Sequence, residues 1–507
     1  MTKTVKEESQ KKNPLFTMEE AAEFLGTSKP TLYRLLDAKK IKGRKVGNQW
    51  RFLKADLQAY LDRGNAGTVL PGVALDLLVS EKAFFTNELS KMGKKVPVTP
   101  DQEAEGPEQQ IAALVGLLLS HAVAAGAGDI HLEALFDQGE VKYLLRLRID
   151  GVLREIRRMA GSVASAMIAC LKNWMSLEGD VRRPQDGRVL MKIDGREVDF
   201  RASFMPAIFG DSVVLRILDR KAVALGIPKV GLSEKGQKTL REWASRSHGL
   251  LIFTGPSGCG KTTLMYSMLQ EISRPALKTM TLEEPVEVAM PWATQIQLNA
   301  AQGMTFANSL RSVLRQDPDV IMVGEVRDAE TMLGCVQAAL TGHLVLTSLH
   351  APDTAAALHR IRDMGIEPFL ISSSLVGIAA QRLVRKVCLH CDAAKTLSTE
   401  ESARMQALAG RSSSTGNGKA RYRQGKGCSR CCESGYQGRT GVFEIMEFTP
   451  ILKEAFLKNV GEDAFRALEI RQGMVSLAAE GVRKAAEGET TAEEVMRVFR
   501  PSEGGEE

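Results

Sequence analysis

The chain has 507 residues, of which 44% are hydrophobic and 25% are charged, and its formal net charge is +6. That length exceeds what a single hydrophobic core supports, so we expect three or four domains of ordinary globular protein. A net charge of +6 is mild for this length. It excludes any conclusion about nucleic acid or membrane binding from overall charge alone.

The N-terminus carries no secretory signal, because residues 1–12 are charged and contain no apolar core. The longest apolar stretch, residues 111–128, is interrupted by Ser120, His121 and glycines, and it is shorter than the roughly 20 apolar residues that span a bilayer. We interpret it as a buried helix. The sequence therefore predicts a cytoplasmic protein whose membrane contact is peripheral.

Residues 1–13 are polar and predicted to be disordered, and residues 14–65 form a compact unit of short elements. Thr17, three residues before Glu20, predicts a capping box at the start of a first helix. Further elements are a helix from Ser28 to Leu36, a strand pair at 45–46 and 50–52 joined at Gly47-Asn48, and a helix at 56–61.

This unit resembles the excisionase-like, MerR-type winged helix-turn-helix. Residues 28–54 carry nine basic side chains against only Asp37, with Tyr33 and Trp50 interleaved. The unit is therefore a candidate DNA-binding module, with residues 28–36 in the major groove and the turn at 47–48 on the backbone. The alternative is a module retained to dock an acidic partner or anionic lipid, because a fold does not fix a function.

Residues 66–110 are predicted to be a linker with some helix between Leu75 and Met92. Residues 111–222 alternate a long apolar helix with strands at 141–149, 189–193 and 213–218, which is an α/β pattern. Residues 223–386 follow strand–loop–helix logic, with strands at 250–254, 278–282, 320–323 and 344–347. That succession predicts a parallel sheet with helices on both sides.

The run from 255 to 262 satisfies the P-loop pattern, and it stands between an apolar strand and an apolar helix face. Glycines let main-chain N–H groups turn toward phosphate oxygens, Lys261 adds a positive charge, and the Thr262 hydroxyl can bind Mg²⁺. The alternative is an ordinary glycine-rich turn in which the lysine does not bind phosphate. The predicted ATP-binding residues are Gly255, Pro256, Ser257, Gly258, Cys259, Gly260, Lys261, Thr262 and Thr263.

Two acidic clusters stand at predicted strand ends, where ligands bind in α/β folds. Glu283 and Glu284 follow one strand and Glu325 follows another, so either Glu283 or Glu325 could orient or deprotonate an attacking water. Taken singly, each cluster also fits a solvated loop. His343 and His350 flank an apolar strand, and Arg311 and Arg315 lie four residues apart on one predicted helix face.

Five of the eight cysteines lie in the last quarter of the chain, and four of them form two C-x-x-C pairs separated by residues 392–427. Four thiolates in this arrangement suit a closed tetrahedral zinc site that staples an insertion too small to fold alone. A redox pair or unrelated buried cysteines are the alternatives, and Cys432 and His390 are possible substitute ligands. The predicted zinc ligands are Cys388, Cys391, Cys428 and Cys431.

The order of motifs from residue 129 to about 445 resembles the secretion-motor ATPases of type II secretion and type IV pilus assembly. The motifs are the stretches 129–133, 146–151 and 184–188, the acidic box at 281–287, the run from 310 through Asp328, and the histidine box at 341–350. The acidic box departs from the family in carrying Glu284 where an aspartate is usual, which leaves the role of Glu284 open. Gly427-Cys428 and the stretch 435–439 resemble the metal-binding subdomain of assembly-type members, which retraction motors lack.

The resemblance implies an α/β fold. It comprises a RecA-like P-loop core (223–386), a preceding PAS-like domain (111–222), a tetracysteine zinc-binding subdomain (387–445) and a helical C-terminus (446–507). It also implies a ring-shaped hexamer with ATP at subunit boundaries, bound to an inner-membrane platform protein. By motif, Glu283 and Glu325 would be the acid pair, and His343 and His350 would respond to the γ-phosphate. Arg188, Arg201, Arg311 and Arg315 would face the nucleotide and neutralise charge on the transferred phosphoryl group.

Three hypotheses follow. The first is a hexameric ATPase that drives assembly of a pseudopilus or pilus from the cytoplasmic face of the inner membrane. The second is a DNA-binding regulator or DNA-acting motor with a related ATPase core, for which the basic residues at 28–54 are the distinguishing feature. The third is a structural ring that does not hydrolyse ATP, which the two intact acidic clusters disfavour.

Overall fold

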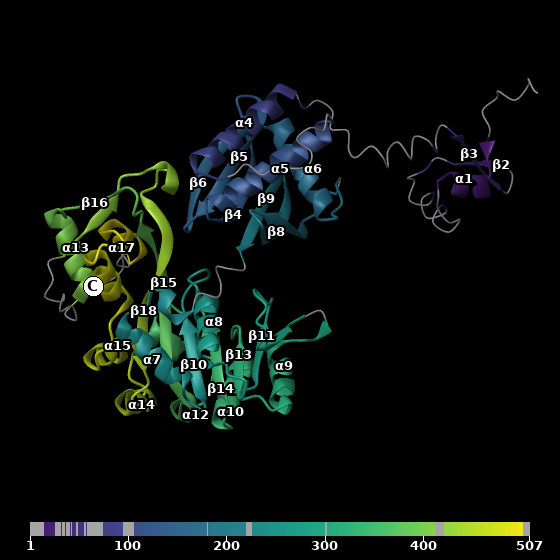
Figure 1. The fold of residues 1–507 in the computed structure, drawn as a ribbon. Coiled ribbons are helices and arrows are strands. Elements are labelled where there is room, and N and C mark those ends of the chain that lie inside the picture. The colour runs from purple at the N-terminus through teal and green to yellow at the C-terminus, as the bar shows by residue number, and fades with distance from the viewer. Residues whose placement is uncertain are drawn as a thin grey trace, which may run out of the picture.

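The computed structural model describes three folded bodies along the chain (Figure 1). None of the helices within the described residues is both long and apolar enough to cross a bilayer. The described residues are 15–25, 32, 36, 41, 43–46, 49–54, 57, 73, 75–94, 106–179, 181–219, 226–299, 302–410 and 420–499.

The N-terminal unit has its own small core, built around Phe52, Leu57 and Ala21. The predicted capping box is present, since the Glu20 N–H donates to Thr17 Oγ1 (3.3 Å) and the Thr17 N–H donates to Glu20 Oε2 (2.8 Å). The predicted strand pair is confirmed, whereas the helices predicted at 28–36 and 56–61 fall largely outside the described residues. The elements are β1 (Leu15–Phe16), α1 (Met18–Phe24), β2 (Arg44–Val46) and β3 (Gln49–Leu53), in the antiparallel order β1-β3-β2.

The second body, here called the N-terminal sheet domain, is a six-stranded antiparallel sheet in the order β6-β5-β4-β9-β8-β7. Side chains alternate along each strand, so Ile130 and Leu132 enter the core under the helices while Asp129 and His131 face the other way. One face is therefore apolar and covered, and the other is polar. The strands are β4 (Ala127–Asp137), β5 (Glu140–Ile149), β6 (Val152–Ala160), β7 (Gln185–Ile193), β8 (Arg196–Ala207) and β9 (Gly210–Asp219), and the helices are α4 (Leu75–Lys91), α5 (Pro107–Ala124) and α6 (Gly161–Trp174).

Helix α4 corrects the prediction that residues 66–110 are a linker. The helix expected between Leu75 and Met92 is present, but Leu78, Phe85 and Leu89 are buried in the same core as α5 and the sheet. These three apolar side chains recur at helical spacing, so one face of α4 packs into the domain core. The mixed composition of residues 66–110 had suggested a linker.

The third body, the core domain, holds a seven-stranded sheet in the order β12-β11-β13-β14-β10-β15-β18. All neighbouring pairs are parallel except β15–β18. Leu250 and Ile252 pack into one core and Leu251 and Phe253 into another, so both faces of β10 are buried, as the continuous apolar run predicted. The strands are β10 (Gly249–Thr254), β11 (Thr279–Glu283), β12 (Thr294–Gln297), β13 (Val320–Val323), β14 (Leu344–Leu349), β15 (Leu375–Val387) and β18 (Tyr436–Glu447).

Helices cover this sheet on both sides. One apolar core contains side chains of α7 and α8, and the other contains side chains of α9 to α12, α14 and α15. The bounds are α7 (Glu234–Ala244), α8 (Lys261–Ile272), α9 (Phe306–Val313), α10 (Ala329–Leu340), α11 (Thr354–Asp363), α12 (Pro368–Ser374), α14 (Pro450–Leu457) and α15 (Glu462–Arg471).

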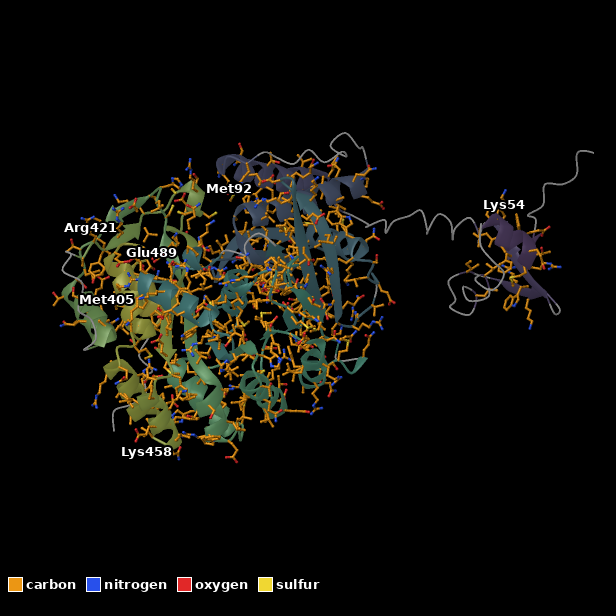
Figure 2. All side chains as sticks on the ribbon, turned by 60° about the horizontal axis from the view of Figure 1, so that its bottom comes forward. Lys54, Met92, Met405, Arg421, Lys458 and Glu489 are labelled. Atoms are coloured by element: carbon orange, nitrogen blue, oxygen red, sulfur yellow. The ribbon has the colours of Figure 1, made fainter. Side chains whose placement is uncertain are left out.

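The cysteine-rich segment leaves the core sheet along β15 and returns along β18 (Figure 1). The predicted boundary at 445 falls inside β18, so this strand belongs to both parts. Met405 of α13 packs against Val482 and Ala485 of α16, and Figure 2 shows Met405, Arg421 and Glu489 on the same lobe. The remaining elements are β16 (Asp392–Ala394), α13 (Thr399–Ala409), β17 (Arg423–Gly425), α16 (Leu477–Ala486) and α17 (Ala492–Val498).

Candidate nucleotide site and tetracysteine site

The predicted phosphate loop connects the end of β10 to the start of α8. Gly255 and Gly260 adopt φ values of 148° and 94°, which disfavour any residue with a side chain. A Cβ at Gly255 would also lie 2.5 Å from the carbonyl oxygen of Gln381 on β15. The loop is therefore packed tightly against the neighbouring strand, and the N-terminus of α8 points its free N–H groups into it.

Lys261 lies inside the curve of this loop. Its Nζ donates to the carbonyl oxygens of Gly255 (2.8 Å) and Pro256 (3.2 Å). Burial lowers the pKa of the Lys261 ammonium group, and the nearby Cys259 thiol and Glu325 carboxylate act in the opposite direction. A positive charge in a partly buried loop at a helix N-terminus is suited to binding phosphate oxygens.

Glu283, at the end of β11, is buried and receives hydrogen bonds on both oxygens. Thr281 Oγ1 (2.6 Å) and Gln295 Nε2 (3.1 Å) donate to Oε1, and the Tyr266 hydroxyl donates to Oε2. These donors fix the orientation of the carboxylate and occupy its oxygens.

Glu325 is more open and follows β13. His350 Nε2 lies 3.2 Å from its Oε2, and Arg327 pairs with its Oε1. Arg327 Nη1 also lies 3.5 Å from Glu284 Oε2, so one guanidinium joins the ends of β11 and β13. Glu284, whose role the sequence left open, is thus an ion-pair partner of Arg327.

Glu287 lies between the phosphate loop and the N-terminal sheet domain. Its carboxyl group lies near the Thr262 side chain and near the guanidinium groups of Arg201 and Arg216. Desolvation by the surrounding protein, followed by the charge of Glu283, raises the pKa of Glu287, whose side chain keeps an exposed surface. The polar face of the N-terminal sheet domain therefore lies near the end of the core sheet that carries the phosphate loop, in the same chain.

That polar face carries a row of three arginines and one aspartate across four strands. Arg188, Arg201 and Arg216 are directly opposite one another on β7, β8 and β9, and Asp129 of β4 lies opposite Arg216. Arg188 is held by Asp199, with Nη2 to Oδ2 at 2.8 Å. Arg216 Nε lies 3.2 Å from Asp129 Oδ1, and Arg148 Nε lies 3.2 Å from its Oδ2. Asp129 thus spaces positive charges that would otherwise repel.

The sulfur atoms of the two C-x-x-C pairs, here called the first and second knuckle, lie close together. The Sγ atoms of Cys388 and Cys428 lie 3.9 Å apart, as do those of Cys391 and Cys431, and all four lie within 4.8 Å of one another. Four sulfurs around one zinc ion at about 2.3 Å would lie roughly 3.8 Å apart, so the spacing fits Zn²⁺. Burial opposes ionisation of Cys431, but hydrogen bonds from the main-chain N–H groups of Cys428 and Gly435 outweigh it and lower the pKa of this thiol to about 7.

Neither substitute ligand belongs to this cluster. Cys432 lies outside the group of four, and its carbonyl oxygen accepts a hydrogen bond from Arg154 Nη1 (3.3 Å). His390 is exposed, and its ring nitrogens lie 3.0 and 3.1 Å from Arg430 Nη1.

Known proteins share both the motifs and the fold. A family model described as type II/IV secretion system protein matches residues 104–497. Type II secretion system protein E of Pseudomonas aeruginosa is 39% identical over 414 residues, which are 82% of this chain and 80% of that protein. The type II secretion system ATPase E of Vibrio cholerae is 38% identical over 426 residues, 84% of this chain and 82% of that protein. The chain belongs to the type II/IV secretion system protein family.

The fold and the N-terminal unit find separate matches. The X-ray structure of the Legionella pneumophila ATPase DotB superimposes with a TM-score of 0.56 at 20% identity, covering 76% of this chain and 94% of that one, which supports the fold. A family model for a helix-turn-helix domain matches residues 15–65. The family resemblance, the fold class and the N-terminal module read from the sequence are thereby confirmed.

One family-based expectation needs correction. Strand β14 separates the two histidines, and it runs parallel to β10 with Leu344 opposite Gly249 and Leu349 opposite Thr254. His350 therefore lies at the phosphate-loop edge of the sheet, while His343 lies at the opposite edge, with Nδ1 2.9 Å from the carbonyl oxygen of Ala338. The six residues of β14 span about 20 Å, so His343 does not reach the phosphate loop of its own chain.

Arg311 and Arg315 are exposed neighbours on α9 and the turn that follows it. Arg311 pairs with Glu330 of α10, and Arg315 Nη1 donates to the carbonyl oxygen of Arg311 (2.9 Å). Their contacts within the described residues are to their own helix and to α10. Arg216, Arg327 and Glu287 are additions to the predicted site. The alternation of Arg216 with apolar neighbours in residues 213–217 was the available signal for an outward-facing arginine.

Proposed function

We propose that this chain is an ATP-hydrolysing motor that works as a hexamer and powers assembly of a type II secretion pseudopilus or a type IV pilus. It would act at the cytoplasmic face of the inner membrane and bind a platform protein there. The observation that carries the proposal is the phosphate loop with Glu325, held by His350 and Arg327, at one edge of the core sheet and the arginine row facing that edge. Such a site suits phosphoryl transfer to water.

Within the site, each group has a distinct task. Lys261 and the N-terminus of α8 would bind the β- and γ-phosphates of ATP. Thr262 and Glu287, whose side chains lie near each other, offer the oxygen ligands that Mg²⁺ prefers, and the ion would neutralise phosphate charge when bound. Arg201 and Arg216 would stabilise the charge that develops on the transferred phosphoryl group.

Glu325 is the better candidate for the base that activates water. Both oxygens of Glu283 already accept hydrogen bonds from buried neighbours, whereas Glu325 is partly open to solvent and contacts groups that a ligand can displace. We assign Glu283 the task of fixing Tyr266 and the loop around Glu284. Glu325 would accept the proton from water, and His350 would report the state of the γ-phosphate.

Two groups complete the motor. Arg311 and Arg315 are exposed, and their contacts within the described residues are to α9 and α10 rather than to the phosphate loop. We therefore assign them to the nucleotide of a neighbouring subunit. The four clustered cysteines would hold a structural Zn²⁺, which closes the subdomain between β15 and β18. Its removal should destabilise the loops that carry the four cysteines, because nothing then links the two C-x-x-C pairs.

The direct test is ATP turnover by the purified full-length chain. Lys261→Ala should lower turnover by about three orders of magnitude, and Glu325→Ala by a similar factor, because each removes a group needed in the transition state. Lys238→Ala, on the exposed face of α7, is the matched control and should behave as the wild type. Persistent turnover in a clean Lys261→Ala preparation would contradict the proposal.

A second activity is favoured by the helix-turn-helix match at residues 15–65. Exposed Arg44 and Lys45 on β2 and Lys54 after β3 give this unit a basic surface, so we propose that it binds DNA. A mobility-shift assay across a salt series should show affinity falling as salt rises, and less steeply for the variant Arg44→Ala/Lys45→Ala. Binding to anionic vesicles without binding to DNA would instead support a docking module.

A further inference from the structure

The N-terminal sheet domain contacts the tetracysteine subdomain of the same chain through the turn between β5 and β6. Asp150 Oδ2 accepts a hydrogen bond from the Gly438 N–H (3.0 Å), and Asp150 Oδ1 lies 3.9 Å from Arg439 Nε. Nearby, Arg154 Nη1 donates to the carbonyl oxygen of Cys432 (3.3 Å). The contact therefore ties the sheet to the start of β18 and to Cys432, the residue that follows the second C-x-x-C pair.

Both surfaces in this contact have fixed shapes. Asp150 and Gly151 have φ values of 50° and 82°, which are those of a two-residue hairpin turn. On the other side, Cys432 has a φ of 49° directly after Cys431, whose sulfur accepts two main-chain hydrogen bonds. Because neither surface has much freedom, the contact sets an orientation as well as a distance.

A continuous set of contacts connects this turn to the arginine row. Arg148, two residues before Asp150, donates from Nη1 to the carbonyl oxygen of Gly151 (3.4 Å). Its Nε pairs with Asp129, and the other oxygen of Asp129 pairs with Arg216. Arg216 in turn lies close enough to Glu287 to lower the pKa of its carboxyl group, and Glu287 lies near Thr262 of the phosphate loop.

We propose that Asp150 is a positioning residue for hydrolysis, which clamps the N-terminal sheet domain to the tetracysteine subdomain and so sets where Arg201 and Arg216 stand above the phosphate loop. The proposal rests on the proposed role of these arginines. The tetracysteine subdomain then has a task beyond its own stability. Cys432, after its second C-x-x-C pair, and Gly438 of β18 form the surface against which the N-terminal sheet domain is aligned.

The test uses the full-length chain with Asp150→Ala and a matched control, Asp194→Ala. Asp194 occupies the same kind of turn between β7 and β8, with φ values of 50° and 74° at Asp194 and Gly195, but its neighbour is Lys94. Two dyes attached through unnatural amino acids at Lys192 and Lys458, both exposed, report the distance between the two domains. Steady-state kcat and KM for ATP and the bound zinc are measured on the same preparations.

Asp150→Ala should change the distance distribution and lower kcat about tenfold, with KM and zinc content close to wild type, because misplaced arginines affect the transition state more than binding. Asp150→Asn keeps an acceptor for the Gly438 N–H and should retain most of kcat. Asp194→Ala should match the wild type in all three readouts.

An unchanged distance with unchanged kcat would overturn the proposal, and so would a loss of zinc in Asp150→Ala. A changed distance with full kcat would support the role of Asp150 in holding the two parts together. It would refute the proposed role of the arginines in hydrolysis. If Asp150→Ala fails to fold, the double variant Arg154→Ala/Arg439→Ala removes the other two links of this contact, those to the Cys432 carbonyl oxygen and to Asp150 Oδ1, and leaves the turn unaltered. The same outcomes apply to it, with a smaller change expected because the hydrogen bond from the Gly438 N–H remains.

Discussion

The two large sheets of this chain contribute to one site in different ways. In the core domain the sheet is parallel and buried on both faces, so its polar groups gather at one edge, in the loops after β10, β11 and β13. In the N-terminal sheet domain the sheet is antiparallel and covered on one face, so its arginines stand in a row across the other face. An edge collects groups from loops that can move, whereas a face holds side chains in a fixed register. The first suits a site that must adapt to a bound nucleotide, and the second suits a template brought against it.

Among the variants that compare the two sheets, the largest effect should come from removing an arginine of the row. Arg216→Ala should lower kcat for ATP hydrolysis by about a hundredfold, because it removes one preorganised cation and leaves Asp129 paired only with Arg148. Steady-state kinetics of the full-length chain measure it. Arg158→Ala, an exposed arginine of β6 that pairs with Glu155, is the control and should stay within about twofold. Equal losses of kcat in both variants would mean that the total positive charge of the domain, and not the position of Arg216 in the arginine row, determines the rate.

A smaller effect should separate the two edges of the core sheet. His350→Ala should lower kcat about tenfold, because Glu325 loses a hydrogen-bond partner. His343→Ala, at the other end of β14, should stay within about twofold in single chains. Rate measurements at low protein concentration, where chains are separate, and at high concentration provide the check. A loss for His343→Ala at high concentration alone would place His343 at a contact between subunits.

The smallest effect should come from the carboxyl groups that are buried in the core domain. The charged groups of the N-terminal sheet domain, by contrast, lie on its polar face. Thr354 Oγ1 lies 2.7 Å from Glu444 Oε1 and 3.0 Å from Glu469 Oε1, and one hydroxyl proton cannot serve both carboxylates. Burial, and then the charge of Glu444, raise the pKa of Glu469 to about 8 from its ordinary 4.5, so Glu469 carries the second proton. Asp353 adds to this rise and Arg466 opposes it.

Folding therefore takes up a proton between pH 4.5 and 8, and the free energy of unfolding falls as the pH rises through that window. Glu469→Gln stays neutral and should raise the melting temperature of the core domain by about 5 °C at pH 9, with almost no change at pH 4.5. Differential scanning calorimetry at the two pH values measures this. An equal shift at both would show that packing, and not ionisation, distinguishes the variant.

The sequence allowed prediction of those parts of the site that are contiguous or follow a strand directly. The phosphate loop, Glu283 and Glu325 are of this kind, because an apolar strand and the residues after it already define an edge. The partnership of Arg188, Arg201 and Arg216 depends on the register of three strands, which a single sequence does not specify. His343 illustrates the converse, since a motif of ten residues groups side chains that an extended strand places at opposite edges. The paired cysteines were predictable as a group, but their exclusion of Cys432 depends on a left-handed residue at that position.

Strands β15 and β18 have a mechanical consequence. Together they form one stiff two-stranded arm, which touches the phosphate loop at Gln381 and ends at the first knuckle, Cys388. The seven residue steps from Gln381 to Cys388 span about 23 Å, so a tilt of about 10° at the loop would displace Cys388 by about 4 Å. Any small tilt beside the phosphate loop would therefore be enlarged at the tip of the arm, which lies against the N-terminal sheet domain.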